Sequence, residues 1–328
     1  MGRWPGIAAA LAFGILSAAA GAESLSRGKD IAEAFLAGET DAVWAEMSPE
    51  MKSALGTADA LAAVQADMRR DFGSESEVLS ERMLRDGPYD VYERTARWTG
   101  SATPLQITVA LDPDGQVAGL WVRPQPKTAD SPYLDYETKT ALRLPFDGAW
   151  YVYWGGRRVE DNHHAIDAGQ RFALDLLVMQ HGQSHSGDPA ILENYYCWDR
   201  PILAPAEGVI VRAVGHLPDQ PIGKSDPSNP AGNHVVIDFG NGEYGFLAHL
   251  RQGSVTVAEG DQVTTGTEVG RCGNSGNTSE PHLHFHLQTS PSLGHGEGLP
   301  AQFLSYLADG EAIENGEPTR GQTVQPIK

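Results

Sequence analysis

The apolar positions near the start of the chain recur at the spacing of an α-helix. Over residues 27–72 they fall into groups at 31–35, 43–47 and 61–68. Residues three and four apart lie on one face of a helix, so this spacing predicts two or three amphipathic helices, each with one face toward a core.

The periodicity then changes to two. Apolar and polar residues alternate in 89–98, 105–111 and 117–124, which is typical of half-buried strands, and Asp-Pro-Asp-Gly at 112–115 predicts a hairpin turn. Helices followed by strands predict a small α+β domain over residues 23–124. It resembles the cone-shaped fold of nuclear-transport-factor-2-like and ketosteroid-isomerase-like proteins. We find no catalytic constellation in it and interpret its carboxylates as a solvated surface.

A polar, proline-containing segment, residues 125–145, predicts a linker. Residues 146–328 form a second domain, in which strands alternate with turns rich in Gly, Asn, Asp and Pro. We expect this second domain to be mainly antiparallel β with almost no helix. Its predicted strands lie within residues 144–156, 171–179, 208–214, 233–250, 254–257, 267–272 and 282–288.

The last of these strands has an unusual pattern of histidines. Residues 282–287 read His-Leu-His-Phe-His-Leu. Successive side chains of a strand point to opposite faces, so the three histidines share one face and the three apolar residues share the other. Imidazole is the commonest metal ligand in proteins, so this face is a candidate metal site. The alternative is a half-buried strand whose histidines face solvent.

Charge and composition narrow the possible partners. The chain has 328 residues, 41% of them hydrophobic, and a formal net charge of -19 at pH 7. The hydrophobic content is typical of a globular protein. The acidic surplus excludes the counterion release that binding to nucleic acid or anionic lipid requires, so we expect no nucleic acid partner.

The N-terminus predicts export. Residues 1–22 contain Arg3, an apolar run from Ile7 to Ala20, and a final Ala-Gly-Ala that fits a signal peptidase site. The run is shorter than the roughly 20 residues that a membrane-spanning helix needs. We therefore expect a signal peptide, a mature chain that begins at Glu23, and a periplasmic or extracellular product without a transmembrane segment. An uncleaved anchor is the alternative.

The order of motifs over residues 150–290 closely resembles the lysostaphin-like zinc metallopeptidases that cut peptidoglycan cross-links. The most specific match is Gly-Asn-Ser-Gly-Asn-Thr-Ser-Glu-Pro-His-Leu-His-Phe at 273–285, which follows Val-Ala-Glu-Gly-Asp-Gln-Val at 257–263. The resemblance implies an exported zinc metalloendopeptidase with one Zn²⁺ per chain. Its substrate would be the peptide part of peptidoglycan, cut by a zinc-activated water.

The resemblance also implies roles for four residues. Asp175 and His284 match zinc ligands, while His249 and His282 match the metal-free histidines beside the scissile bond. A catalytic zinc keeps three protein ligands and a water whose pKa falls to about 7. Two imidazoles beside it can serve as a base and as an oxyanion donor. The sequence leaves open which histidine does which.

The two cysteines lie in segments that the family's sheet brings into the same region. We therefore expect a disulfide between Cys197 and Cys272, which export permits. Two free buried thiols are the alternative. The pair has the wrong number and spacing for a zinc site.

One ligand of the family is missing. The family places a histidine four residues before the aspartate, where this chain has Arg171, and arginine cannot ligate a metal. We interpret the preceding residues as a hairpin with a turn at 167–169, in which Asn162 and His164 share a face and His163 points away. Cross-strand Cβ atoms lie about 5 Å apart, so His164 is the expected third zinc ligand. His163 as the ligand, or loss of the site, are the alternatives.

Two further points stay open. His286 stands where the family often has an acidic residue, and it either orients a ligand or faces solvent. Because of Arg171, the competing function is a catalytically degenerate module that binds cell wall or activates a partner hydrolase. A protease acting on extracellular proteins would share the same site.

Overall fold

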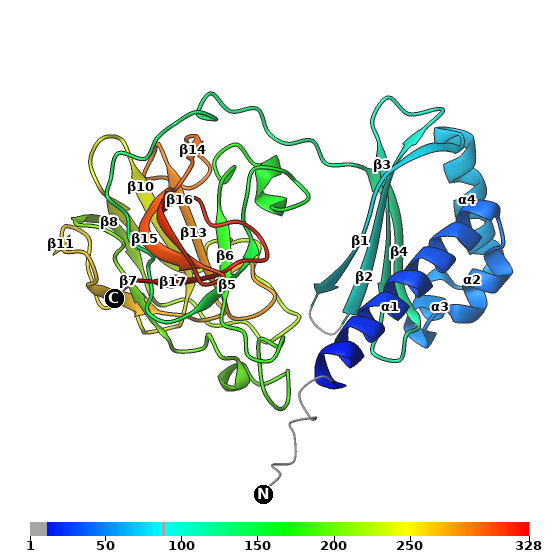
Figure 1. Ribbon diagram of the computed structural model, residues 1–328, viewed down its shortest axis with the longest axis horizontal. Coiled ribbons are helices and arrows are strands. Elements are labelled where there is room, and N and C mark those ends of the chain that lie inside the picture. The colour runs from blue at the N-terminus through cyan, green and yellow to red at the C-terminus, as the bar shows by residue number, and fades with distance from the viewer. Residues whose placement is uncertain (1–11, 87–88, 328) are drawn as a thin grey trace, which may run out of the picture. The chain divides into compact units, whose positions relative to one another are not determined.

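Two compact units, residues 1–125 and 126–328, make up the computed structural model of the chain (Figure 1). The structure describes residues 12–86 and 89–327, so the predicted signal peptide at 1–22 lies partly outside the described residues. Among the described helices, none combines the length and the apolar character that crossing a membrane requires.

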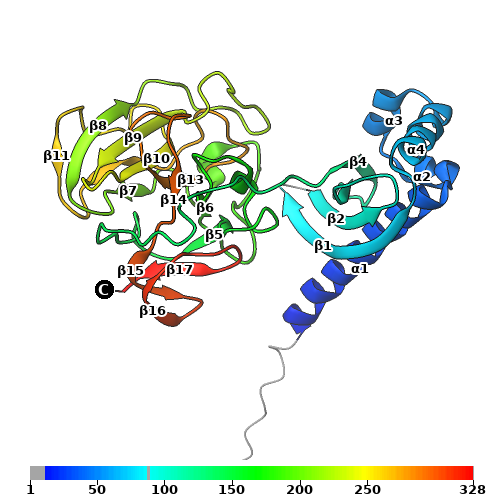
Figure 2. The ribbon, with the colours of Figure 1, turned by 90° about the horizontal axis from the view of Figure 1, so that it is seen from above.

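The first unit packs helices against one face of a four-stranded antiparallel sheet of order β1-β2-β3-β4 (Figure 2). This confirms the predicted α+β class. The helices are α1 (Ala12–Ala37), α2 (Thr40–Glu46), α3 (Pro49–Leu55) and α4 (Ala58–Phe72), and the strands are β1 (Glu75–Asp86), β2 (Tyr89–Trp98), β3 (Leu105–Leu111) and β4 (Val117–Pro124).

The helices are more numerous than the two or three that were predicted, because side-chain caps divide the region. Ser48 accepts the backbone N–H of Met51 and starts α3, and Thr57 accepts that of Ala60 and starts α4. The predicted hairpin turn is present, and its Asp112 carboxylate accepts two backbone N–H groups. Strand β1 was not predicted, because polar residues occupy both of its faces.

The sequence suggested that the carboxylates of this unit form a solvated surface, but some of them bind a buried side chain. The side chain of Arg94 is only 8% exposed and forms ion pairs with Glu75 and Glu81. Tyr92 donates a further hydrogen bond to Glu81. A buried guanidinium needs such partners, which explains why these two glutamates pair with Arg94.

The second unit is almost entirely β, as predicted. Its main sheet has the order β11-β8-β9-β10-β13-β6-β5-β17-β15-β16, with β14 paired to β13, while β7 and β12 form a separate pair. The strands are β5 (Trp150–Trp154), β6 (Leu174–Leu177), β7 (Pro201–Leu203), β8 (Gly208–Val214), β9 (Asn233–Asp238), β10 (Tyr244–Leu250), β11 (Gln262–Val263), β12 (Glu268–Arg271), β13 (Leu283–Gln288), β14 (Gly298–Leu299), β15 (Phe303–Ala308), β16 (Glu311–Gly316) and β17 (Thr323–Pro326), joined by the 3₁₀ helices η1 (His163–Ile166) and η2 (Leu192–Asn194).

Strand β13 divides the core from the site. Leu283, Phe285 and Leu287 are at most 1% exposed and belong to the main hydrophobic cluster of this unit. Full burial of such a side chain stabilises the fold by roughly 1.5–3 kcal/mol. The alternating histidines therefore lie on the opposite face, as the pattern predicted.

Two segments of this unit differ from the sequence predictions. Residues 254–257 contain no strand, and their backbone contact with β12 is a hydrogen bond from Thr256 N to Val269 O. The expected linker packs against the second unit over much of its length, because Leu142 and Leu144 are buried in its core and Tyr136 donates to the buried Glu243 carboxylate.

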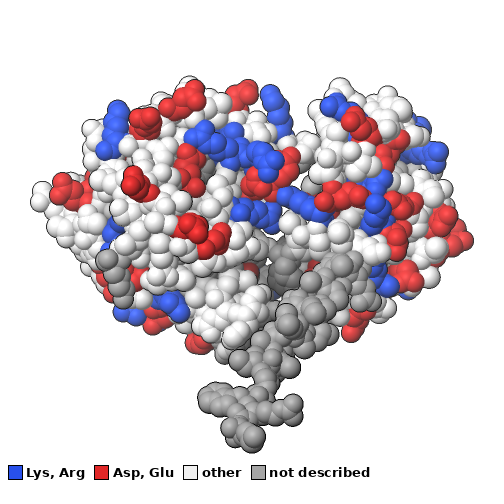
Figure 3. Space-filling view, viewed as in Figure 1, with Lys and Arg blue, Asp and Glu red and all other residues white. Residues whose placement is uncertain are grey.

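Charged side chains of both signs are interspersed on the face of each unit seen in Figure 3. This distribution accords with a chain whose formal net charge is -19.

The predicted disulfide is present between Cys197 and Cys272, whose Cα atoms lie 5.9 Å apart. Both residues are buried in the core of the second unit. The bond joins the segment before β7 to the end of β12, and these two strands pair with each other.

Replacing both cysteines with serine should lower the free energy of unfolding of the second unit by about 4 kcal/mol. The bond closes a loop with a sequence separation of 75 residues, and the chain-entropy model gives that magnitude for a loop of this size. Urea unfolding followed by circular dichroism would measure it. An unchanged transition midpoint would contradict this expectation.

Candidate functional site

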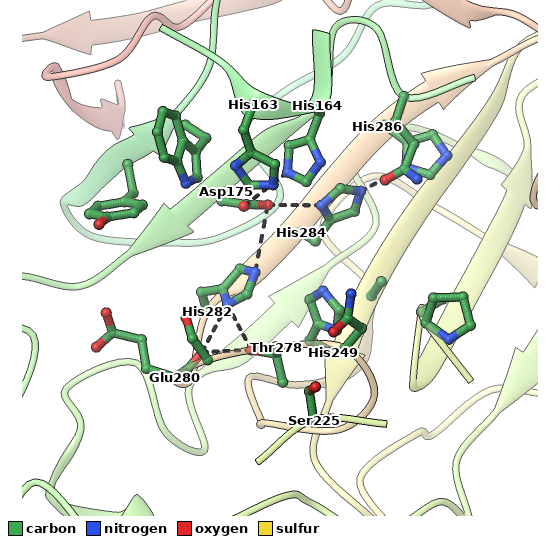
Figure 4. A pocket seen from close by; sticks show the side chains of 18 of the residues that line it. His163, His164, Asp175, Ser225, His249, Thr278, Glu280, His282, His284 and His286 are labelled. Carbon is green, nitrogen blue, oxygen red and sulfur yellow. Dashed lines mark hydrogen bonds and ion pairs between the residues drawn. The ribbon is translucent and has the colours of Figure 1, made fainter. Parts of the chain in front are cut away.

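The centre of the site is the carboxylate of Asp175. It lies on β6, directly opposite His284 of β13 in the antiparallel register, and is 6% exposed. One carboxylate oxygen, Oδ1, lies 2.8 Å from His284 Nδ1, and the other, Oδ2, lies 2.9 Å from His164 Nε2. Two imidazoles from different elements therefore converge on one buried carboxylate (Figure 4).

His164 reaches this position from a 3₁₀ helix and not from a hairpin strand, so the predicted hairpin is wrong. The helix η1 is capped by Asn162, whose side-chain oxygen accepts the N–H of His164 at 3.1 Å. The Asn162 amide also donates to Gly156 O and Ala173 O, so this residue holds the backbone instead of facing the site.

The same helix corrects the expected orientation of His163. A 3₁₀ helix has three residues per turn, so neighbouring side chains do not point to opposite sides as they would in a strand. Donor atoms of His163, His164 and Asp175 all lie within 4.8 Å of one another. The ring of His163 also packs edge-on against Trp154, with ring centroids 4.9 Å apart.

Arg171 does not enter the site. Its guanidinium is buried and donates to the backbone oxygens of Ala129, at 3.0 Å, and Arg157, at 2.7 Å. Ala129 in turn donates its N–H to Ala165 O of η1. Arg171 thus helps to hold the helix that carries His164.

His249 and His282 are oriented in the same way. Each directs Nδ1 at a backbone oxygen, Ser275 O at 2.9 Å for His249 and Glu280 O at 2.8 Å for His282. A carbonyl only accepts, so each Nδ1 carries the proton and each Nε2 keeps a lone pair while the ring is neutral. The two rings lie 4.7 Å apart, and His282 Nε2 is 3.6 Å from an Asp175 oxygen.

Burial and charge set the protonation of these groups. Burial, together with the nearby rings of His282 and His284, lowers the pKa of His249 well below its ordinary value. Burial also lowers the pKa of His282, but the Asp175 carboxylate more than offsets this, so its pKa is raised. Burial alone would raise the pKa of Asp175, yet the His164 and His282 rings hold that pKa well below its usual range.

His286 is 2% exposed, so the alternative in which it faces solvent is wrong. Its Nδ1 lies 3.0 Å from His284 Nε2, and its ring stacks on Phe246 with centroids 4.4 Å apart. His286 therefore contacts the far side of the ring whose near side faces Asp175.

These residues line a cavity of about 470 Å³ (Figure 4). Several further residues line this cavity that were not predicted from the sequence, including Tyr153, Lys224 and Thr278. Thr278 Oγ1 lies 3.2 Å from His282 Nδ1. Its place four residues before His282, inside the recognised motif, was the available signal.

The donor set fits a zinc ion. One carboxylate and two imidazoles are the ligand types of catalytic zinc sites with three protein ligands. Asp175 and His284 are buried and lie on paired strands, and His164 brings a second imidazole to Asp175 from η1.

The metal-free second unit should lose stability as the pH falls from 7 to 5. His249 and His286 are held neutral in the fold, with pKa values well below 6.5, whereas unfolded histidines take up protons below that pH. The unfolded state then binds more protons, so stability falls, by up to about 2 kcal/mol per histidine at pH 5. His282, with its raised pKa, acts in the opposite direction.

Thermal unfolding in a chelator at several pH values would measure this dependence. The variant His286→Phe removes one of the groups and should flatten the curve. A melting temperature that stays constant from pH 7 to pH 5 in the parent protein would contradict the expectation.

Part of the second unit is similar in sequence to known peptidases. Residues 198–293 match the model of peptidase family M23. The peptidoglycan DD-endopeptidase ShyA of Vibrio cholerae serotype O1 is 33% identical over 87 residues, which are 26% of this chain and 17% of that protein. The chain thus spans less than a fifth of the length of that curated relative.

Two solved structures are similar at low identity. The catalytic domain of lysostaphin from Staphylococcus simulans is 21% identical, covers 46% of this chain and 88% of its own, and has a TM-score of 0.28. A zinc-containing peptidase from Vibrio cholerae is 15% identical, covers 64% of this chain and 55% of its own, and has a TM-score of 0.25.

The matched segment contains His249, His282 and His284, whereas His164 and Asp175 precede it. It also contains the strands β7 to β13 that form much of the second unit. Residues 198–293 of the second unit are therefore similar to peptidase family M23.

Proposed function

We propose that this chain is an exported zinc metalloendopeptidase that hydrolyses peptide cross-links of bacterial peptidoglycan. The observation that carries the proposal is the convergence of His164 and His284 on Asp175, with His249 and His282 beside them in one cavity of the second unit. The curated relative ShyA is a peptidoglycan DD-endopeptidase, which supports the choice of substrate.

Under this proposal His164, Asp175 and His284 hold one Zn²⁺. Zinc in such a site supplies a bound water of lowered pKa and polarises the substrate carbonyl. The geometry supports His164 over His163 as the third ligand, because His164 Nε2 contacts the carboxylate at 2.9 Å. The first unit, after removal of residues 1–22, serves as an accessory domain.

His249 and His282 act on protons and charge. Each presents Nε2 to the cavity because its Nδ1–H is held by a backbone carbonyl. A neutral Nε2 accepts a proton, and a protonated one donates to a developing oxyanion, so the pair can share the roles of base and stabiliser.

The degenerate alternative was motivated by Arg171, which has no lone pair to offer a metal. In the structure its guanidinium is engaged with two backbone oxygens, and His164 lies against the carboxylate. A non-catalytic wall-binding module stays the competing function.

Incubating the purified chain with isolated cell wall separates the two functions. The peptidase should create new amino termini in the wall peptides, detected by mass spectrometry after muramidase digestion of the glycan, and a chelator or Asp175→Ala should abolish them. Binding of cell wall without any new amino terminus, from protein shown to contain zinc, would favour the wall-binding module.

A further inference from the structure

A chain of polar contacts runs along β13 behind the site. His284 Nε2 lies 3.0 Å from His286 Nδ1, and His286 Nε2 lies 3.2 Å from Gln288 Oε1. All three residues are at most 4% exposed. Buried polar atoms are paired with few exceptions, so each contact in this chain must have one donor and one acceptor.

The contacts of Gln288, at the far end of this row of side chains, show which atom of each contact is the donor. The amide nitrogen of Gln288 lies 2.6 Å from Ser290 O and 3.0 Å from Ser292 O. Both are backbone carbonyls, which only accept, so the NH₂ group must face them. The opposite orientation would set the Gln288 oxygen against two further oxygens. Gln288 Oε1 therefore faces His286 as an acceptor.

The protons of the two histidines then follow in order. His286 donates from Nε2 to Gln288, so the neutral ring has its lone pair on Nδ1. That lone pair accepts from His284, whose proton is therefore on Nε2. The remaining lone pair of His284, on Nδ1, faces the Asp175 carboxylate at 2.8 Å. Two acceptors that face each other at this distance are satisfied by a cation.

We propose that Gln288 and His286 are positioning residues that fix the proton of His284 on Nε2 and so make Nδ1 the zinc-binding atom. The inference rests on the proposed zinc site and adds two residues to it. Gln288 accepts the Nε2 proton of His286, and His286 therefore accepts the Nε2 proton of His284 through its Nδ1. Stacking on Phe246, with centroids 4.4 Å apart and planes 13° from parallel, holds the His286 ring in the required plane.

The sequence makes this arrangement possible through its period of two. Residues 284, 286 and 288 share one face of β13, so three polar side chains at alternate positions can contact one another in a row. The two serine carbonyls come from the loop that follows the strand.

The zinc affinity of the full chain, measured by competition with a chromogenic chelator, tests the proposed roles of Gln288 and His286. His286→Phe keeps the ring and its stacking but has no acceptor, and Gln288→Leu removes the directing oxygen. Each should weaken zinc binding about 10- to 100-fold, which is typical of lost outer-shell partners. His286→Gln, which can accept from His284 and donate to Gln288, should restore affinity to within a few-fold. His216→Ala, a substitution of an exposed histidine outside the site, should change nothing.

A second readout does not depend on any variant. Long-range proton–nitrogen NMR of the ¹⁵N-labelled, zinc-loaded chain reports which nitrogen of each histidine carries a proton. We expect His284 to be protonated on Nε2 and to bind metal through Nδ1. A zinc-loaded chain in which His284 is protonated on Nδ1 would overturn the assignment, even if the variants proved too unstable to measure.

The outcomes separate this inference from the proposed function. Normal zinc affinity in the parent protein, His286→Phe and Gln288→Leu alike would overturn the proposed roles of Gln288 and His286 and leave the zinc peptidase intact. A parent protein that binds no zinc would overturn both.

Discussion

Changing His164 to alanine should cost this protein its zinc, while changing His163 to alanine should not. His164 Nε2 contacts the Asp175 carboxylate at 2.9 Å, so its loss leaves two ligands, Asp175 and His284. Loss of an outer-shell partner alone costs 10- to 100-fold in affinity. Loss of a direct ligand should therefore cost at least about 100-fold, with a similar or larger fall in hydrolysis.

His163 provides the matched control, because it is the adjacent residue on the same short helix and the same residue type. Its ring packs against Trp154, and the carboxylate hydrogen bond belongs to its neighbour. Zinc content by mass spectrometry after dialysis, together with the rate at which new amino termini appear in cell wall, measures both variants. If His163→Ala loses zinc and His164→Ala retains it, the two residues exchange roles and our assignment is wrong.

His249→Ala and His282→Ala should give the opposite separation, with zinc retained and turnover lost. Neither ring is needed to complete the set of three ligands, and each holds its Nε2 toward the cavity. Groups that move protons or stabilise developing charge typically contribute 10²- to 10⁴-fold to a rate. We therefore expect kcat to fall by about that factor in each variant, with at most a small change in KM.

The double variant adds a sharper test. If the two histidines act on the same transition state, their combined loss should be smaller than the product of the single losses. The exposed His216→Ala serves as a control that retains both zinc and rate. Loss of zinc from His282→Ala would show that this residue is a ligand, and would contradict its role as a metal-free base or oxyanion stabiliser.

The sequence predicted the parts of this site that depend on a simple period. Alternation in residues 282–287 placed one face of β13 in the core and the other in the site, and the structure agrees. The disulfide between Cys197 and Cys272, which was expected from the family resemblance, is also present.

The local geometry around His164 was beyond such patterns. An Asn followed by two histidines is compatible with a strand, and the decision for a 3₁₀ helix comes from Asn162, which caps the turn while its amide binds two backbone oxygens. Those oxygens are brought near by tertiary packing. A single sequence contains no signal for them, and so the orientation of His163 was predicted wrongly.

The row of contacts behind His284 was hidden for a similar reason. His286 could be singled out from its position, but its role depends on Gln288, and Gln288 is oriented by two carbonyls of a loop. The packing of the expected linker, residues 125–145, could not be predicted from its sequence either. Its polar composition masked Leu142 and Leu144, which fill the core of the second unit.

The most direct test of the account is anomalous X-ray scattering at the zinc edge from crystals of the zinc-loaded chain. We expect one strong peak bound by His164 Nε2, Asp175 and His284 Nδ1, at the roughly 2.0–2.2 Å typical of zinc with nitrogen and oxygen ligands. A peak whose ligands exclude His164, or no peak in crystals grown with excess zinc, would contradict the central claim that His164 is the third zinc ligand of this site.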